Sequence, residues 1–337
     1  MPGLKYALVF VCVIIAAFFS FAIAGRYALH APTAGTYVSS LKLGHATILF
    51  GGDMMFDRTV RKVVDEKGGD FIFSCIKDTL KAADVVVANL EGPITPNASV
   101  SATSTPEDRF NYTFTFPPQT AELLYSHNVR MVNLGNNHIL NFGKGGVMST
   151  IKFLKNAGVG YFGSPTDDGV ATSTIKDISF AFINYNEFAP AKHTNILEYV
   201  GMFSGTIRQI QEARAGGYIP IVYAHWGVEY ATTSSAYSRE LAHSFVDAGA
   251  EIVIGSHPHV IQEHEIYKGK HIYYSLGNFV FDQYFSEEVR NGLLLKVTFG
   301  QNGVIAIKEI PVYLEVDRRT CPVEQSPFFK YSQRTRS

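Results

Sequence analysis

Short apolar runs alternate along the chain with segments whose apolar residues have a helical spacing. The runs are rich in β-branched residues and predict strands at 46–50, 85–90, 129–134, 180–185, 219–224 and 251–254. Between them, the spacing predicts helices at about 70–83, 118–127, 146–157, 198–213 and 238–248. Strands that alternate with helices are typical of an α/β fold.

After residue 260 the pattern changes. "HIYYSLGNFVF", "GLLLKVTF" and "VIAIKEIPVYLEV" follow one another without a helix and predict antiparallel strands. The polar segment 93–117 predicts a surface insertion beside the end of a strand. We therefore expect one folded domain at 45–316, followed by a basic C-terminal tail at 317–337.

The N-terminus carries a long uncharged apolar run. "LKYALVFVCVIIAAFFSFAIAG" has Lys5 near its start and no other charge. Because a bilayer-spanning helix needs about 20 residues, residues 1–25 predict a transmembrane anchor and 26–44 a linker. The alternative is a signal peptide cleaved after Ala24, since the preceding small residues fit that pattern. We expect a single-pass protein of the cell membrane with its domain outside the cytoplasm, or a secreted protein if the signal is cleaved.

Charge and cysteine content narrow the function classes. Lys and Arg number 29 against 30 acidic residues, so no strong net field points to a nucleic-acid partner. The three cysteines, Cys12, Cys75 and Cys321, have no CxxC spacing, which argues against a thiolate zinc site or a redox motif. Cys75 and Cys321 can pair if the domain is exported, or remain as two thiols.

Residues of the kinds that bind metals stand directly after five predicted strands. In open α/β sheets ligands bind at the carboxyl ends of strands, so we expect these side chains to converge. Taken singly, each has a plain alternative as a turn residue, a helix cap or a hydrogen-bonded structural histidine. Together, the oxygen donors and imidazoles predict a site for one or two divalent ions (Mn, Fe or Zn). The residues are Asp53, Glu91, Asn136, Asn137, His138, His225, His257 and His259.

His257 and His259 flank a proline in "GSHPHV". Residues two apart in an extended segment face the same side, and Pro258 keeps His257 out of helical angles. Both rings are therefore expected to point into one site. Two metals about 3.5–4 Å apart and bridged by a carboxylate could each take one ring, polarise a substrate oxygen and activate water.

Six motifs in sequence order carry a family resemblance: "GGDMMFDR", "ANLEGPIT", "NLGNNH", "AHWGVEY", "GSHPHV" and "YSLGNFVFD". Over about residues 46–285 the chain resembles the CapA capsule-synthesis proteins, which are associated with poly-γ-glutamate. That family is similar to the calcineurin-like metallophosphoesterases. The resemblance implies a four-layer αββα sandwich of the metallophosphoesterase type, here preceded by the N-terminal transmembrane helix.

The resemblance also implies roles for the site residues. Asp53 and His259 would bind a first metal, and Glu91 stands where the bridging carboxylate belongs. Asn137, His225 and His257 would bind the second metal. His138 would be the catalytic acid that protonates a leaving group.

Two departures from the phosphoesterase pattern affect the first metal. Asp53-Met54-Met55 replaces Asp-x-His, and Glu91 replaces an aspartate. A thioether is a poor ligand for such ions, so a single-metal enzyme or an inactive site stays open.

Residues beside the motifs are predicted to contact the substrate. Arg58 and Glu229 suit an anionic substrate, although Arg58 can equally be a salt-bridge partner. Asn278 and Asp282 can each hydrogen-bond to a residue of the site without touching the metal, or can be turn residues. The predicted substrate-binding set is Arg58, Asn136, Glu229 and Asn278.

The leading hypothesis is an exported CapA-like metal-dependent hydrolase, cleaving a phosphoester or an amide, in the synthesis, export or trimming of a poly-γ-glutamate-type polymer. Its expected partners are the anionic surface polymer or its precursor, the membrane, and other capsule-synthesis membrane proteins. One alternative is an exported metallophosphoesterase unrelated to capsule. Another, prompted by Met55, is a non-catalytic polymer-binding or assembly component.

Overall fold

The computed structural model describes residues 44–188 and 196–323, whose strands form one eight-stranded and one six-stranded sheet. The predicted anchor at 1–25 and nearly all of the linker at 26–44 lie outside the described residues. Among the described helices, none has the length and apolar character that crossing a bilayer requires.

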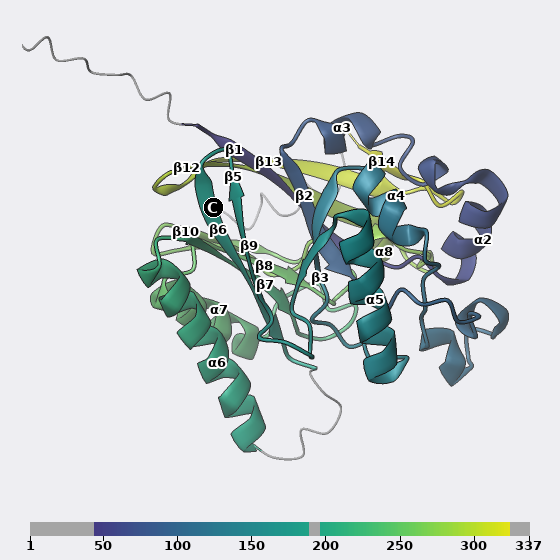
Figure 1. The fold of residues 1–337 in the computed structure, drawn as a ribbon, viewed down its shortest axis with the longest axis horizontal. Coiled ribbons are helices and arrows are strands. Elements are labelled where there is room, and N and C mark those ends of the chain that lie inside the picture. Colours follow the sequence, from purple (N-terminus) through teal and green to yellow (C-terminus); the bar gives the residue numbers. More distant parts are fainter. Residues whose placement is uncertain (1–43, 189–195, 324–337) are drawn as a thin grey trace, which may run out of the picture. The chain divides into compact units, whose positions relative to one another are not determined.

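The larger sheet carries the strands that start and end the described chain (Figure 1). Its central strand β1 is parallel to β2 on one side and antiparallel to β12 on the other. The short β11 (Asn278–Val280) pairs in parallel with the carboxyl end of β1, off the main path. The main order is β14 (Thr320–Pro322), β13 (Gly303–Leu314), β12 (Asn291–Gly300), β1 (Ala46–Met54), β2 (Val85–Leu90), β3 (Val129–Asn133) and β4 (Gly160–Phe162).

The second sheet contains the strands that end at the remaining predicted ligands. β7 lies between β6 and β8 and is parallel to both, so their carboxyl ends share one edge. The full order is β5 (Val170–Ile175), β6 (Ile178–Asn186), β7 (Ile219–His225), β8 (Ile252–Ser256), β10 (Lys270–Tyr273) and β9 (His264–Tyr267).

Successive strand residues point to opposite faces, and here both faces are buried. In β1, Leu49 belongs to the core under the helices of the larger sheet, whereas Phe50 belongs to the core between the sheets. In β7, Tyr223 joins the same inter-sheet core and Val222 packs under the other helices. Burial on both faces explains why the strands are continuous apolar runs. The predicted α/β class is confirmed.

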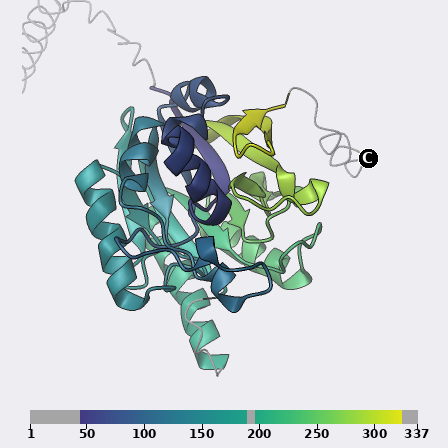
Figure 2. The same cartoon turned by 90° about the vertical axis from the view of Figure 1, so that its right-hand side faces the viewer.

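Helices cover the outer face of each sheet, which produces the layer order helix, sheet, sheet, helix (Figure 1). α6 (Ile196–Ala215) and α7 (Ala236–Ala248) pack on the smaller sheet. In Figure 2 the dark blue helices of residues 58–81 face the viewer. The larger sheet carries α2 (Arg58–Lys67), α3 (Lys77–Lys81), α4 (Thr120–Ser126) and α5 (Gly143–Ala157); α8 (Glu287–Arg290) precedes β12, and short 3₁₀ turns lie at Gly69–Phe71, Ser101–Thr103 and Arg109–Tyr112.

The sequence prediction had no element at α2, β4 or β5, and the structure differs from it in strand direction, in one helix and at the end of the domain. β10 and β11 pair in parallel with β8 and β1, where only antiparallel strands were expected. The helix expected at 70–83 is a 3₁₀ turn followed by the five-residue α3. β14 lies within the predicted tail and pairs with β13, so the domain continues past the boundary expected at residue 316.

A disulfide joins Cys75 to Cys321 across a sequence separation of 246 residues. It ties the segment before α3 to the edge strand β14. A cross-link restricts the unfolded chain, and removing a native disulfide typically costs about 2–5 kcal/mol. We expect Cys75→Ser to lower the free energy of unfolding by that amount, measured by urea denaturation.

Reductant should lower the free energy of unfolding of the parent protein to that of Cys75→Ser. It should leave the free energy of unfolding of Cys75→Ser unchanged. Cys12→Ser, in the apolar N-terminal run, is the control and should behave as the parent. Equal stability of the oxidised parent and Cys75→Ser would contradict the expectation.

Candidate metal centre

The predicted ligands come together at one place, although they arrive from two sheets. Asp53 is the last residue but one of β1, and Glu91 directly follows β2, in the larger sheet. In the smaller sheet His225 ends β7 and His257 directly follows β8. Two groups of carboxylate and imidazole atoms form there, each with its ligand atoms within 4.8 Å of one another. Glu91 belongs to both groups.

The first group contains Asp53, Glu91 and His259. His259 lies between the two carboxylates, with Nδ1 3.4 Å from Asp53 Oδ2 and Nε2 3.6 Å from Glu91 Oε1. All three side chains are buried. This group provides two oxygen donors and one imidazole, a mixture that suits Mn, Fe or Zn.

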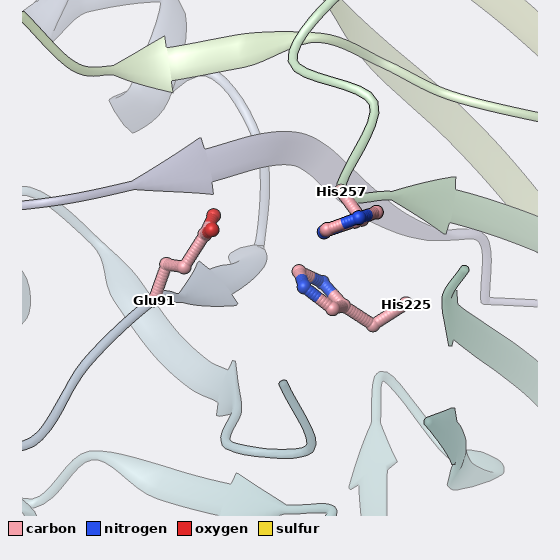
Figure 3. A group of neighbouring side chains, drawn as sticks. All are labelled: Glu91, His225 and His257. Atoms are coloured by element: carbon pink, nitrogen blue, oxygen red, sulfur yellow. The ribbon is translucent and has the colours of Figure 1, made fainter. Parts of the chain in front are cut away.

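The second group contains Glu91, His225 and His257. Figure 3 shows the Glu91 carboxylate directed toward the two imidazoles. The ring centroids of His225 and His257 are 4.8 Å apart. Asn137 Oδ1 lies 2.9 Å from His225 Nε2, so the fourth predicted ligand of the second metal is also present.

Hydrogen-bonding groups hold His225 at both ring nitrogens. Its Nδ1 lies 2.9 Å from the hydroxyl oxygen of Ser256, which donates to the carbonyl of Ala224, and 3.4 Å from Asn89 Nδ2. Its Nε2 lies 2.9 Å from the amide oxygen of Asn137. Contacts of this kind orient a metal-binding imidazole.

Electrostatics at the centre also favour a bound cation. Burial, and then the neighbouring Asp53 charge, raise the pKa of Glu91 well above its usual value. Burial alone would raise the pKa of Asp53, but the hydrogen bond and charge of His259 outweigh it and lower the pKa. Burial, with His259 nearby, lowers the pKa of His257 to about 3, so its ring is neutral at pH 7, the form that binds metals.

Two buried polar atoms at the centre have no hydrogen-bond partner among the described residues: Glu91 Oε1 and His257 Nδ1. An unpaired buried polar atom typically costs about 1–3 kcal/mol. Divalent ions at the two groups would satisfy such atoms. The residues present therefore fit the metal centre that the family resemblance implied.

The sequence predicted that His257 and His259 lie in an extended segment, and this prediction is wrong. The segment is bent, not extended: φ is +97° at His257 and +59° at His259, in the region that L-residues rarely adopt. The His257 N–H donates to Asp53 Oδ2 at 3.1 Å, which holds the bend against β1. Strained backbone of this kind clusters at functional sites.

His138, the predicted acid, lies at the edge of the first group. Its Nε2 is 3.9 Å from Glu91 Oε1. Asn141 Oδ1 accepts from the backbone N–H of Phe114 and lies 3.2 Å from His138 Nδ1, so it fixes the proton on Nδ1. Burial lowers the pKa of His138 to about 4, and the ring is neutral at pH 7. Its role as an acid stays a prediction.

Met55 does not take part in the centre. Its side chain is fully buried in the core under the helices, and its sulfur accepts the N–H of Asp57 at 3.0 Å. The position that carries an imidazole in the phosphoesterase pattern is therefore a core position here. The first group therefore offers three predicted ligands, Asp53, Glu91 and His259.

Of the four predicted substrate contacts, Arg58, Asn136 and Asn278 bind other residues of the protein. Arg58 Nη2 pairs with Asp282 Oδ1 at 2.5 Å and its Nη1 donates to Asn111, so the salt-bridge alternative describes it. Asn136 Nδ2 donates to Asn89 and to the carbonyl of Leu90, which shapes the loop behind Glu91. Glu229 is exposed.

Asn278 orients a predicted ligand. Its Nδ2 donates to Gln283 and to the carbonyl of Val289, so its Oδ1 accepts from His259 Nδ1 at 3.0 Å. Partners that orient metal-binding histidines typically contribute 10- to 100-fold in metal affinity. We expect Asn278→Leu to weaken divalent-metal binding about 10- to 100-fold, and Asn278→Asp, which keeps the acceptor, to weaken it less. Isothermal titration with Mn²⁺ measures both, and equal affinity of Asn278→Leu and the parent would refute the role.

The sequence prediction missed Asn89, which lies at the centre of the hydrogen bonds behind the site. Its Nδ2 donates to Asp53 Oδ1 at 2.8 Å, and its Oδ1 accepts from Asn133 and Asn136. Ser256, which orients His225, was missed too. The available signal was a polar side chain near the end of an otherwise apolar strand, because buried polar groups require partners.

Comparison with known proteins shows the family of the chain. A family model described as "Bacterial capsule synthesis protein PGA_cap" matches residues 47–283. The chain belongs to this family. It is 29% identical over 322 residues to the PGA biosynthesis protein CapA of Bacillus subtilis (strain 168), covering 91% of this chain and 80% of that protein. It is 28% identical over 288 residues to the capsule biosynthesis protein CapA of Bacillus anthracis, covering 80% of this chain and 67% of that protein.

Among solved structures, the PGA_cap chain is similar to TT1561 of Thermus thermophilus at a TM-score of 0.42 and 11% identity. The match covers 76% of this chain and 99% of that chain. A likeness at this score does not bear on function. The family assignment rests on the match over residues 47–283.

Proposed function

We propose that this PGA_cap protein is a metal-dependent hydrolase of metallophosphoesterase type. We further propose that it acts outside the cytoplasm in the synthesis, export or trimming of a poly-γ-glutamate-type surface polymer. The observation that carries the hydrolase part is the pair of ligand groups that share Glu91. The polymer is inferred from family membership and from the names of the Bacillus relatives.

The residues of the centre divide into binding and positioning roles. Asp53 and His259 would hold one ion, His225, His257 and Asn137 the other, and Glu91 both. Bound divalent metal supplies Lewis-acid chemistry, polarising the oxygen of the scissile group and lowering the pKa of water. Asn278 accepts from His259 Nδ1, which leaves Nε2 of that ring toward Glu91, and Ser256 orients the ring of His225.

His138 is placed to exchange a proton with a leaving group. Its Nε2 is the atom that faces the centre, because Nδ1 is held by Asn141. A cavity of about 330 Å³ opens beside Asn137 and Phe188, which is room for one or a few residues of a polymer. We propose phosphoester or amide hydrolysis there.

The disulfide supports a location outside the cytoplasm. Bonds such as Cys75–Cys321 form and persist in oxidising compartments and are rare in the cytosol. Together with the apolar N-terminal run, this favours a membrane-anchored or secreted domain. The anionic polymer and other capsule-synthesis membrane proteins are the proposed partners.

A second candidate function follows from Met55. Because a core methionine stands where the phosphoesterase pattern has an imidazole, the chain suits a polymer-binding or assembly role without catalysis. The two functions differ in turnover and in metal content. An exported phosphoesterase unrelated to capsule differs in its substrate.

The test compares the full-length parent with a His257→Ala, His259→Ala double variant by elemental analysis after loading with Mn²⁺, Fe²⁺ or Zn²⁺. We expect up to two ions per parent chain and none in the double variant. Poly-γ-glutamate and an aryl phosphodiester are then offered to the loaded parent and to His138→Ala. Turnover of the polymer supports the main proposal, and turnover of the phosphodiester alone supports the phosphoesterase. A parent chain that binds no divalent ion would leave the non-catalytic role.

A further inference from the structure

Two exposed aromatic side chains stand beside the metal centre, on loops from two parts of the chain. Tyr230, in the loop after β7, has its ring centroid 6.1 Å from that of His259. Phe285, in the loop after β11, meets Tyr230 at a centroid distance of 5.1 Å and an interplanar angle of 90°. Tyr230 is 39% exposed and Phe285 66%, which is unusual for neighbouring aromatic residues.

Tyr230 is held rigidly in this position. Its φ is +65°, in the left-handed region that is strained for an aromatic residue. Its backbone N–H donates to Pro258 O at 2.8 Å. Its hydroxyl accepts from Gln283 Nε2 at 3.1 Å, and Gln283 in turn accepts from Asn278, the residue that orients His259. The loop thus presents a fixed ring beside a predicted ligand.

A carboxylate stands next to this pair of rings. Burial, and then the Glu229 charge beside it, raise the pKa of the Tyr230 hydroxyl. The Glu229 charge also acts on the buried Glu91 carboxyl and raises its pKa, so Glu229 is near the metal centre as well as near Tyr230. The charge of Arg58 acts on Glu91 and on Tyr230. Arg58 is itself paired with Asp282.

Two aromatic rings at a right angle with a carboxylate beside them suit an ammonium group. The ring faces attract a cation through their quadrupole. The carboxylate adds a charged hydrogen-bond acceptor. The Glu229 carboxylate would repel a carboxylate of a polyanion, so Glu229 does not suit the anionic contact expected from the sequence. A neutral sugar ring would gain nothing from the charge.

We infer that Tyr230, Phe285 and Glu229 form a recognition site for a primary ammonium group of the substrate, next to the metal centre. The inference rests on the proposed function for the chemistry that follows binding. In a polymer of amino acids the free ammonium group lies at the amino end. The protein would therefore bind a chain by its amino end and place the adjoining bond at the metals.

The test is binding of a matched pair of probes, γ-glutamylglutamate and its N-acetyl derivative, to the full-length chain by isothermal titration. We expect the free amine to bind at least about tenfold more tightly, which corresponds to about 1.4 kcal/mol. Glu229→Gln, which keeps the size and removes the charge, should bring the two affinities to within about twofold of each other. Phe285→Ala should weaken binding of the free amine.

Two variants of exposed residues away from the centre serve as controls. Glu240→Gln on α7 and Ile266→Ala on β9 should keep the parent's preference. Equal binding of both probes by the parent, no binding of either, or an unchanged preference in Glu229→Gln would overturn the inference. None of the three residues is a predicted ligand, so their variants should keep the metal content of the parent. Probe binding is therefore measured with and without Mn²⁺, and metal content is measured separately. A failed ammonium site thus leaves a metal-loaded hydrolase intact, whereas failure of the proposed function appears as missing metal.

Discussion

Replacing Glu91 with Gln is expected to stabilise the metal-free protein and to abolish most of the stabilisation that divalent metal provides. Glu91 is fully buried, and burial together with the Asp53 charge disfavours its ionised form. A neutral amide of the same size removes that repulsion. The same carboxylate belongs to both ligand groups, so its loss weakens both metals.

The magnitude follows from linkage between binding and folding. At a metal concentration 100 times the dissociation constant, binding stabilises the parent by about 2.7 kcal/mol. Loss of a direct ligand should cost on the order of 100-fold in affinity or more, the upper end of what its supporting partners contribute. The gain in Glu91→Gln then falls below about 0.5 kcal/mol at the same concentration.

The measurement is the melting temperature in EDTA and across a Mn²⁺ or Zn²⁺ titration, with Glu240→Gln as the matched control. In EDTA, Glu91→Gln should melt at or above the parent temperature. If metal raised the melting temperature of the variant as much as that of the parent, Glu91 would not be a shared ligand.

Gly52→Ala is expected to unfold or severely destabilise the domain. A Cβ at this position would lie 1.8 Å from the carbonyl oxygen of Gly277, which is backbone and has no free side chain to move. The same carbonyl accepts the N–H of Asp53 at 3.1 Å, so the collision also displaces a predicted ligand. The cost should reach or exceed the upper end of the about 1–3 kcal/mol that overpacking causes.

Gly300→Ala is the matched control, because there the added Cβ meets the Cδ1 atom at the end of the partly exposed Ile305 side chain, which can rotate away. Urea denaturation and metal titration of the two variants give the comparison. A Gly52→Ala protein with the stability and metal affinity of the parent would show that β1 and β11 do not approach as the structure has them.

The sequence predicted the chemistry of the centre better than its geometry. Asp53, Glu91 and His225 were found because each stands at or just after the end of an apolar run, which is a local signal. The bend at His257 was not predicted, because it depends on a hydrogen bond to Asp53, 204 residues earlier. Arg58 and Asp282 each have a plausible local role, and only their contact across 224 residues shows that they pair.

Local pattern was sufficient for the alternation of strands and helices up to residue 260, the kind of side chains at the strand ends and the family. These depend on side-chain type and on the periodicity of burial, which are properties of short segments. Long-range packing alone decided that the ligands come from two sheets, that Cys75 bonds to Cys321, and that Met55 is a core residue. Such contacts join residues far apart in the chain, and nothing in a short segment specifies which distant partner it meets.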